Sequence, residues 1–323
     1  MTPKMTGDNV NQYESNEAYD LLKLLEANKD DDYIISPFSN MSSNCEYYEP
    51  SDFNRVTNGT KGTNMSCFHL NCRGLSKNWE NFDHLIKTLH GTDFSFDFVG
   101  ISECFRHTHD SRINLDGYHD LISRNRESDY RGGVGLFIKQ SIQFKVCNDL
   151  SVFIPNVFES VFVEAHCGKN AKQIIGVIYR PNTAPKADID IFTDTLNELL
   201  DIINKEKKYA IIMGDMNIDL LKFETNECVN RYIEVVFSNG FIPAITKPTR
   251  IGETSATLID HMLCNNFKHQ FKSGVIITDV ADHFGIYHII EHDKFTHNIG
   301  EVKTRKFCEK KMQQFDGNCF SYV

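Results

Sequence analysis

Residues 209–217 read YAIIMGDMN, an apolar run that ends in a carboxylate, Asp215, and an amide, Asn217. The run has the length and composition of a buried strand. Asp215 and Asn217 are two residues apart, so on an extended chain their side chains point to the same side. A single Asp or Asn at a strand end is most often a turn or cap residue. The segment therefore indicates a functional site only if other strands end in the same way.

Two earlier apolar runs do end in this way. SCFHLN (66–71) alternates like a strand and ends at Asn71, and FDFVGISE (96–103) is almost continuously apolar and ends at Glu103. A near-continuous apolar run is typical of a strand that is covered on both faces. These runs predict a sheet core that carries polar side chains at its strand ends.

The rest of the chain mixes strands with amphipathic helices. Apolar residues recur at helical spacing in NWENFDHLIKTLH, where Trp79, Phe82, Ile86 and Leu89 share a face, and again at about 186–206 and 226–239. Further strands are predicted at 132–140, 159–167 and 173–181, and in ATLIDHMLC, SGVIIT and FGIYHII. Such a mixture predicts an α/β sandwich of two packed sheets with helices outside.

We expect three segments along the chain. Residues 1–62 are rich in Asn, Ser, Asp and Tyr and read as a mostly disordered lead-in with one helical patch, YDLLKLLEA. Residues 63–292 form the folded domain, and 293–323 form a polar, basic tail.

Composition excludes several classes of protein. The 323 residues include 34 basic and 44 acidic ones, a formal net charge of −10, which argues against a strong nonspecific nucleic-acid binder. The ten cysteines show no CxxC and no paired Cys/His spacing, so we expect mostly small buried thiols. No apolar run is long enough for a membrane span, and the N-terminus lacks the pattern of a secretory signal. We expect a nuclear or cytoplasmic protein that is not secreted.

Further polar groups follow apolar runs later in the chain. They are Tyr179 after IIGVI, Asp260 within ATLIDHML, and Asp282 with His283 after VIITDVA. Carboxylate and amide oxygens suit a hard cation such as Mg²⁺, and a carboxylate can hold an imidazole in one tautomer. Each residue alone has an ordinary structural explanation, so the prediction depends on the set.

This set resembles the endonuclease/exonuclease/phosphatase superfamily, which includes deoxyribonuclease I and the apurinic endonucleases. The ordered matches, from about 65 to 291, are HLN, ISE, IYRPN, IIMGDMN, LIDHM and ADH. The resemblance implies a four-layer sandwich, with two mixed sheets between helices, and metal-dependent hydrolysis of a phosphoester.

Four segments look closer still to the endonuclease domain of non-long-terminal-repeat retrotransposons of the jockey type. They are NCRGLSKN, RGGVGLFIK, ITKPTR and SATLIDHM. The resemblance implies nicking of duplex DNA with Mg²⁺, or Mn²⁺, as cofactor. It also implies a reverse transcriptase domain as a partner in the parent element. That domain is absent here, because the chain has no YxDD run and only 32 residues follow Glu291. We expect the chain to be encoded by a truncated or fragmentary mobile element.

The resemblance also implies a role for each matched residue. Glu103 would bind the metal, with Asn71 as ligand or support, and Asp282 would complete the carboxylates on the metal side. Asp215 would activate or orient the attacking water, and Asn217 would hold this water or a phosphate oxygen. Tyr179 would donate to the phosphate, and Asp260 would orient His283, which stabilises the phosphoryl oxygens. Thr249 and Thr257 would contact the DNA backbone.

One departure concerns the position two residues after Asn71. Many apurinic members have an acidic residue there, whereas this chain has Arg73. An arginine weakens the case for abasic-site repair and could clamp a phosphate, so we add it to the DNA-binding residues. Three alternatives stay open: a phosphatase or lipid phosphodiesterase on the same fold, an abasic-site nuclease, and an inactive remnant that binds nucleic acid weakly.

Overall fold

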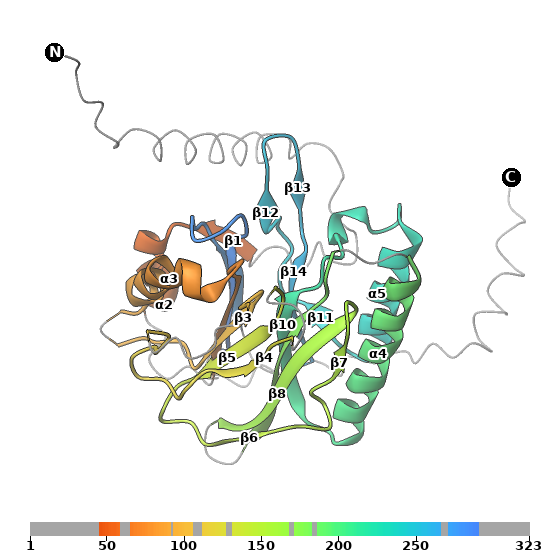
Figure 1. Ribbon diagram of the computed structural model, residues 1–323, viewed down its shortest axis with the longest axis horizontal. Helices are drawn as coiled ribbons and strands as arrows, with labels where there is room; N and C mark the ends of the chain where they lie inside the picture. The colour runs from red at the N-terminus through yellow and green to blue at the C-terminus, as the bar shows by residue number, and fades with distance from the viewer. Residues whose placement is uncertain are drawn as a thin grey trace, which may run out of the picture.

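The structure is a computed structural model that describes residues 45–58, 65–91, 93–105, 112–126, 131–167, 171–182, 186–265 and 271–290. Two β-sheets pack face to face, and helices cover the outer face of each sheet (Figure 1). The predicted α/β sandwich of four layers is confirmed.

The first sheet contains seven strands of mixed direction. In spatial order they are β1 (Cys45–Tyr48), β15 (Phe271–Ile276), β16 (Gly285–Ile290), β2 (Met65–Asn71), β3 (Phe98–Ser102), β5 (Val134–Ile138) and β4 (Ile122–Arg124). The pairs β1–β15 and β2–β3 are parallel, and the other pairs are antiparallel.

The second sheet is also mixed. Its strands in spatial order are β11 (Ile242–Pro243), β14 (Asp260–Cys264), β10 (Tyr209–Asp215), β9 (Ala171–Tyr179), β8 (Phe158–Cys167) and β6 (Phe144–Val146), with β7 (Phe153–Ile154) on β8. A separate hairpin of β12 (Arg250–Ile251) and β13 (Ala256–Thr257) projects beyond both sheets (Figure 1).

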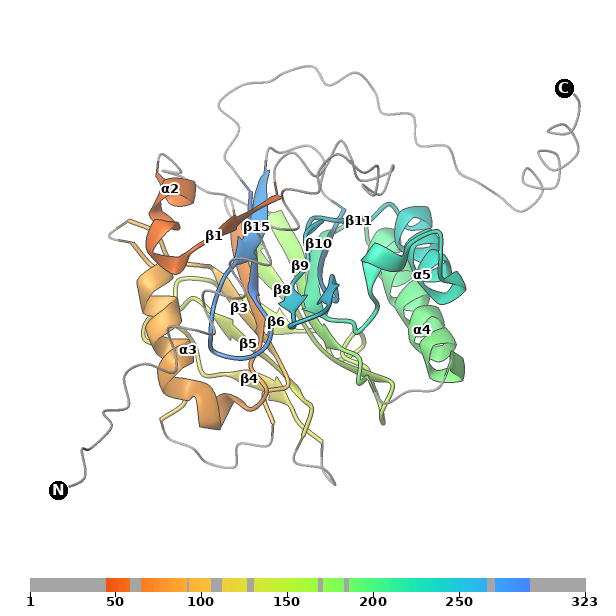
Figure 2. The ribbon, with the colours of Figure 1, turned by 90° about the horizontal axis from the view of Figure 1, so that it is seen from above.

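The helices form the two outer layers. On one side lie η2 (Pro50–Asp52), α2 (Asn54–Thr57) and α3 (Leu75–Leu89), and on the opposite side lie α4 (Lys186–Lys205), η3 (Leu220–Lys222) and α5 (Glu227–Ser238) (Figure 2). The predicted apolar stripe of α3 is confirmed, because Trp79, Phe82, Ile86 and Leu89 are all buried. One apolar cluster lies between the sheets and beneath α4 and α5, and a second lies beneath α2 and α3.

Two glycines allow the close packing on which the site depends. A Cβ at Gly100 of β3 would lie 2.9 Å from side-chain atoms of both Met213 and Val177 in the other sheet. A Cβ at Gly214 would lie 1.8 Å from the carbonyl oxygen of Ile178. A side chain at Gly100 would force Met213 and Val177 to shift, whereas a side chain at Gly214 would meet the backbone of β9. The glycine of the GDMN segment is therefore required for the approach of β10 to β9.

Packed structure begins before residue 63, the predicted start of the folded domain. Residues 45–58 were expected within the disordered lead-in, but Cys45 and Phe53 are fully buried. Phe53 stacks on Phe96, with ring centroids 5.6 Å apart, and packs edge-on against Tyr287, with ring centroids 5.0 Å apart. Burial of one phenylalanine is worth about 2–3 kcal/mol, so a few apolar anchors hold a segment whose composition is mostly polar. The helical patch YDLLKLLEA and the tail from 293 lie outside the described residues.

Two expectations from composition concern the described residues. Cys45, Cys67, Cys72, Cys104 and Cys264 are buried free thiols, as predicted, whereas Cys147 and Cys228 are partly exposed. Among the described residues, no helix has the length and apolar character needed to cross a bilayer.

Candidate active site

The sequence-predicted residues come from both sheets and meet at the same end of the sandwich. In the first sheet the parallel pair β2–β3 places Asn71 opposite Ser102, immediately before Glu103. In the second sheet Asp215 pairs with Tyr179 on β9 and with Asp260 on β14. Carboxyl ends of parallel strands lie at one edge of a sheet, so the two polar edges face each other where the sheets pack.

Asn71 joins the two sheets through one nitrogen. Its Nδ2 donates to Oε1 of Glu103 at 3.0 Å and to Oδ2 of Asp215 at 2.8 Å. Its Oδ1 accepts from the backbone N–H of Arg73 at 3.1 Å, which fixes the orientation of the amide. We call Asn71, Glu103 and Asp215 the carboxylate cluster. Asn71 therefore turns its nitrogen, not its oxygen, toward the carboxylates, as a positioning residue does.

Tyr179 and Asn217 extend this cluster. The Tyr179 hydroxyl donates to Oε1 of Glu103 at 3.1 Å. Asn217 donates through its backbone N–H to Oδ1 of Asp215 at 2.9 Å and through Nδ2 to Oδ2 at 3.2 Å. Asp215 thus accepts three hydrogen bonds, so its carboxylate is held in one orientation.

Three residues of the site have left-handed backbones. The φ angles are 44° for Arg73, 50° for Glu103 and 46° for Asn217. Such conformations cost of the order of 1 kcal/mol or more outside glycine and persist only where the surroundings fix them. Here the Glu103 carbonyl accepts from the Gly74 N–H at 2.8 Å. This turn directs the Glu103 side chain out of its strand toward Asn71.

The second part of the site is a carboxylate–imidazole pair. Nδ1 of His283 lies 2.8 Å from Oδ2 of Asp260, and the Thr249 hydroxyl donates to the same oxygen at 2.6 Å. Burial by itself would raise the pKa of Asp260, but the charge and hydrogen bond of His283 outweigh it and lower that pKa. Burial likewise works against a charged His283, yet Asp260 raises the pKa of His283 to about 9. His283 is therefore a cation at neutral pH, and its Nδ1–H donates to Asp260.

Asp215 connects the cluster to this pair. Ligand atoms of Asp215, Asp260 and His283 all lie within 4.8 Å of one another, and all three residues are buried. Burial and then the charge of Asp260 raise the pKa of Asp215 to about 7. A carboxylate with this pKa is suited to accept a proton near neutral pH.

Two sets of residues could hold a divalent cation. The Asp215–Asp260–His283 group has the spacing of a metal site. However, a metal-bound histidine must be neutral, whereas His283 is a cation that is paired with Asp260. Glu103 is partly exposed, and its Oε2 accepts no hydrogen bond from the described residues. The hard oxygens of Glu103 therefore fit Mg²⁺ better, with water and phosphate as its other ligands.

Asp282 forms ion pairs with two arginines and makes no hydrogen bond to the carboxylate cluster. Its Oδ2 accepts from Nε and Nη2 of Arg250 at 3.0 and 2.6 Å, and Nη1 of Arg73 lies 2.9 Å from the same oxygen. Its pKa is lowered, because the charge of His283 and the two arginines outweigh the effect of burial. The role of Asp282 beside the metal, which the resemblance implied, stays a prediction that these contacts do not favour.

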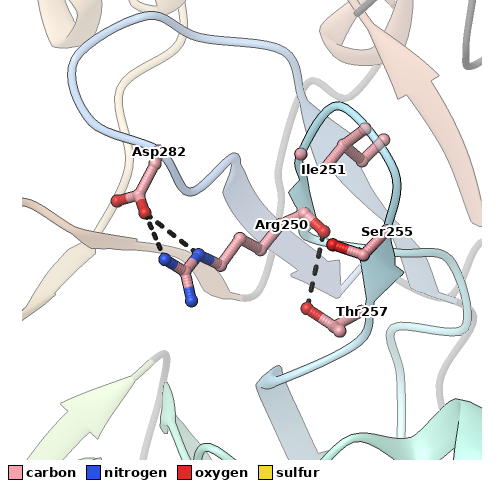
Figure 3. Close-up of a pocket in the computed structure, with 6 residues that line it drawn as sticks. Arg250, Ile251, Ser255, Thr257 and Asp282 are labelled. Atoms are coloured by element: carbon pink, nitrogen blue, oxygen red, sulfur yellow. Dashed lines mark hydrogen bonds and ion pairs between the residues drawn. The ribbon is translucent and has the colours of Figure 1, made fainter.

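A pocket of about 260 Å³ opens beside this ion pair (Figure 3). Its lining comes from the hairpin and from the loop before β16: Arg250, Ile251, Gly252, Ser255, Thr257 and Asp282. Figure 3 shows Arg250 reaching from the base of the hairpin to Asp282. Thr257 lines this pocket, as a residue that contacts substrate would.

The expected contact of Thr249 with DNA stays a prediction that its burial does not favour. Thr249 is fully buried, and its hydroxyl also accepts the backbone N–H of Asp260 at 3.1 Å. Its hydroxyl holds Asp260 through these hydrogen bonds, and no part of its side chain is exposed. Arg73, in contrast, has a side chain that is 56% exposed and stays a candidate for contact with DNA.

Sequence reasoning missed several supporting residues. Arg180 is buried and donates to the carbonyl oxygens of Met216 and Asn217, while the Arg180 carbonyl accepts from Nδ2 of Asn217 at 2.7 Å. Its presence in the IYRPN segment was the available signal. His69 is a core residue with Nε2 2.9 Å from the Ser102 hydroxyl, and burial lowers its pKa to about 4. No pattern in the sequence distinguishes this neutral histidine from a surface one.

Comparison with solved structures identifies the fold. The mannosyl-6-phosphatase Bt3783 of Bacteroides thetaiotaomicron is similar with a TM-score of 0.53 at 16% identity, covering 71% of this chain and 100% of that one. The catalytic domain of APE2 from Xenopus laevis gives 0.52 at 16% identity, covering 70% and 92%. The endonuclease domain of TRAS1, a telomere-specific non-LTR retrotransposon, gives 0.52 at 12% identity, covering 70% and 98%.

No family model and no curated protein matches the sequence. At these identities the structural likeness establishes the fold. The chain has the two-sheet sandwich of endonuclease/exonuclease/phosphatase proteins, as its motifs predicted.

Proposed function

We propose that this chain, which has a fold shared by nucleases and phosphatases, is a Mg²⁺-dependent endonuclease that nicks one strand of duplex DNA. One observation carries the proposal. Asn71 bridges the carboxylates of Glu103 and Asp215, and the cationic His283 lies against Asp215 on the other side. Hydrolysis of a phosphodiester needs an acceptor for the proton of water and fixed positive charge for the phosphoryl oxygens, and both are within this group.

In the proposed reaction a water oxygen attacks the scissile phosphorus, and its proton passes to the carboxylate of Asp215. The bond between phosphorus and the 3′ oxygen breaks, and the 3′ oxygen takes up a proton from solvent. The products are a 3′ hydroxyl and a 5′ phosphate. A cation held by Glu103 would offset the charge that develops on the phosphoryl group.

The protein's own residues stabilise the transition state and hold the attacking group. The imidazolium of His283, fixed by Asp260, donates to a non-bridging oxygen. Asn217 orients Asp215 through two hydrogen bonds, and the Tyr179 hydroxyl holds Glu103. Loss of one such group typically costs about 10²–10³ in rate.

A polymeric substrate is favoured by what surrounds the cluster. Arg73 and Arg250 place two guanidinium groups beside Asp282, which leaves one net positive charge in this group of three side chains. The pocket beside them has room for a sugar or phosphate next to the scissile one. Guanidinium groups that flank the reacting phosphate suit a DNA backbone, which presents a phosphate at every nucleotide. The motifs similar to retrotransposon endonucleases favour target-site nicking by a mobile element.

A phosphatase on the same fold is the second candidate, because the similar structures include a mannosyl-6-phosphatase. The purified full chain should convert supercoiled plasmid to open circles with Mg²⁺, and both EDTA and Asp215→Ala should stop the conversion. Release of phosphate from phosphomonoesters without any nicking would favour the phosphatase. Failure of both activities in the folded wild-type protein would favour the inactive remnant.

A further inference from the structure

Strand β1 brings a residue of the N-terminal segment to the back of the Asp260–His283 pair. β1 extends the first sheet by pairing in parallel with β15, so that Tyr47 lies opposite Val275 (Figure 2). The Tyr47 hydroxyl donates to the carbonyl oxygen of Pro248 at 3.0 Å. Its ring packs edge-on against Phe284, with ring centroids 6.5 Å apart and planes at 84°.

These two contacts fall on the chain neighbours of the catalytic pair and its support. Pro248 precedes Thr249, whose hydroxyl donates to Asp260, and Phe284 follows His283. The two loops are tied together, because the Phe284 N–H donates to the Thr249 carbonyl at 2.7 Å. Tyr47 therefore contacts both loops that hold the pair, one through its hydroxyl and the other through its ring.

Lys247 adds a second link between the same segments. Its ammonium group lies 5.1 Å from the centroid of the Tyr47 ring and 3.0 Å from Oε2 of Glu46. The lysine side chain is only 20% exposed, so these contacts confine the loop that leads to Thr249. These contacts of Tyr47 and Lys247 involve no residue of the carboxylate cluster.

We propose that Tyr47 is a positioning residue for the Thr249–Asp260–His283 arrangement, and that β1 is part of the catalytic structure. The proposal deepens the proposed nicking activity and rests on it for its catalytic consequence. The hydroxyl of Tyr47 fixes the position of the loop that contains Thr249, and the ring of Tyr47 fixes the position of Phe284. Together they set the position of the imidazolium against Asp260. A misplacement of the order of 1 Å at such a group is sufficient to slow a reaction about a hundredfold.

The test compares Tyr47→Phe with Tyr48→Phe in the full chain. Both substitutions remove one hydroxyl from β1, but adjacent strand residues point to opposite faces. Tyr48 packs against Tyr287, with ring centroids 6.2 Å apart, in the second apolar cluster. Tyr48→Phe therefore removes the same chemical group from the same strand as Tyr47→Phe. The two substitutions differ only in which face of the sheet loses the hydroxyl.

Two readouts separate positioning from a general loss of structure. The first is the downfield NMR signal of the His283 Nδ1 proton in the metal-free protein, assigned by its loss in His283→Asn. The second is kcat and KM for plasmid nicking. We expect Tyr47→Phe to shift the proton signal and to lower kcat about tenfold at a KM within about twofold, the loss of one net hydrogen bond. Tyr48→Phe should change neither.

Equal effects of the two substitutions would overturn the proposal, because they would reflect the stability of the strand. An unchanged proton signal in Tyr47→Phe, with the same melting temperature as wild type, would also overturn it. If the wild-type chain does not nick DNA, the proposed function fails, and the proton signal still decides whether Tyr47 positions His283.

Discussion

Glu103 and Asp215 belong to different sheets, yet their carboxylates accept hydrogen bonds from the same nitrogen, Nδ2 of Asn71. Two carboxylates this close repel each other unless a donor or a cation lies between them. The amide of Asn71 supplies the donor, and a bound divalent ion would supply the charge. The packing of the two sheets is therefore coupled to the chemistry of the site.

Replacement of Asn71 by alanine tests this coupling. Without the shared donor the two carboxylates lose their common orientation, and we expect the affinity for Mn²⁺, used as a probe of the Mg²⁺ site, to fall about 10- to 100-fold. Electron paramagnetic resonance of free Mn²⁺ measures it directly. The control is Asn78→Ala, which also removes a side-chain amide. The Asn78 amide donates to the backbone carbonyl of Cys72, the residue that follows Asn71, and does not contact the carboxylates. Equal loss in both variants would show that the loop, not the shared donor, determines affinity.

The pH dependence of nicking should show an alkaline limb set by His283. Asp260 raises the pKa of His283 to about 9, so activity that needs the imidazolium is retained below that value and lost as pH rises through it. Asp260→Asn removes the charge that raises this pKa, so the limb should move toward the ordinary histidine value of 6.5. The measurement is kcat/KM against pH for both proteins. An alkaline limb at the same pH in Asp260→Asn would contradict the assignment.

The position of Asp282 predicts an unusual gain. Because Asp282 pairs with Arg250 and Arg73 and makes no hydrogen bond to the carboxylate cluster, Asp282→Asn should leave the Mg²⁺ titration of nicking within about twofold of wild type. It should also tighten binding to duplex DNA several-fold at low salt, because two guanidinium groups lose their counter-ion.

The matched control for this change is Asp201→Asn on α4, which also removes one negative charge from a pair with a cation, Lys205. It should leave DNA binding almost unchanged. A large loss of Mg²⁺ affinity in Asp282→Asn would instead support the metal-side role that the sequence resemblance implied.

A buried ion pair beneath the site predicts a specific loss of stability. Glu159 is fully buried, accepts from Nε of Arg126 at 2.6 Å, and also accepts from the Gly133 N–H at 2.6 Å. Removal of one partner leaves an uncompensated buried charge, so Arg126→Met should lower the free energy of unfolding by about 3–5 kcal/mol. Chemical denaturation measures it. Arg231→Met breaks an exposed pair with Asp190 and should cost far less, and similar losses in the two variants would refute the account.

The fold was largely predictable because its signals are local. The apolar runs that end at Asn71, Glu103 and Asp215 fix three strands and their polar tips, and the spacing of Trp79 and Phe82 fixes α3. Short strands were missed where too few residues alternate to show a period. β1, with four residues in a polar segment, is the example that matters for function.

The supporting residues of the site were less predictable, since tertiary contacts alone define their roles. The resemblance implied that Thr249 contacts DNA, but the packing of its loop buries Thr249 against Asp260. Tyr47 lies more than 200 residues from Pro248 in the chain, and no local pattern reports such a contact. Polar residues at strand ends can be predicted from the sequence. The contacts by which loops orient those side chains are defined only in the folded chain.

The ends of the nicked strand test the central claim most directly. If the carboxylate cluster and His283 hydrolyse the bond to the 3′ oxygen, plasmid nicked by the full chain with Mg²⁺ carries a 3′ hydroxyl and a 5′ phosphate. DNA ligase should then reseal almost all of the open circles, and Glu103→Gln, Asp215→Asn and His283→Asn should each reduce nicking at least about a hundredfold. Open circles that ligase cannot reseal, or nicking that persists in Asp215→Asn, would contradict the account.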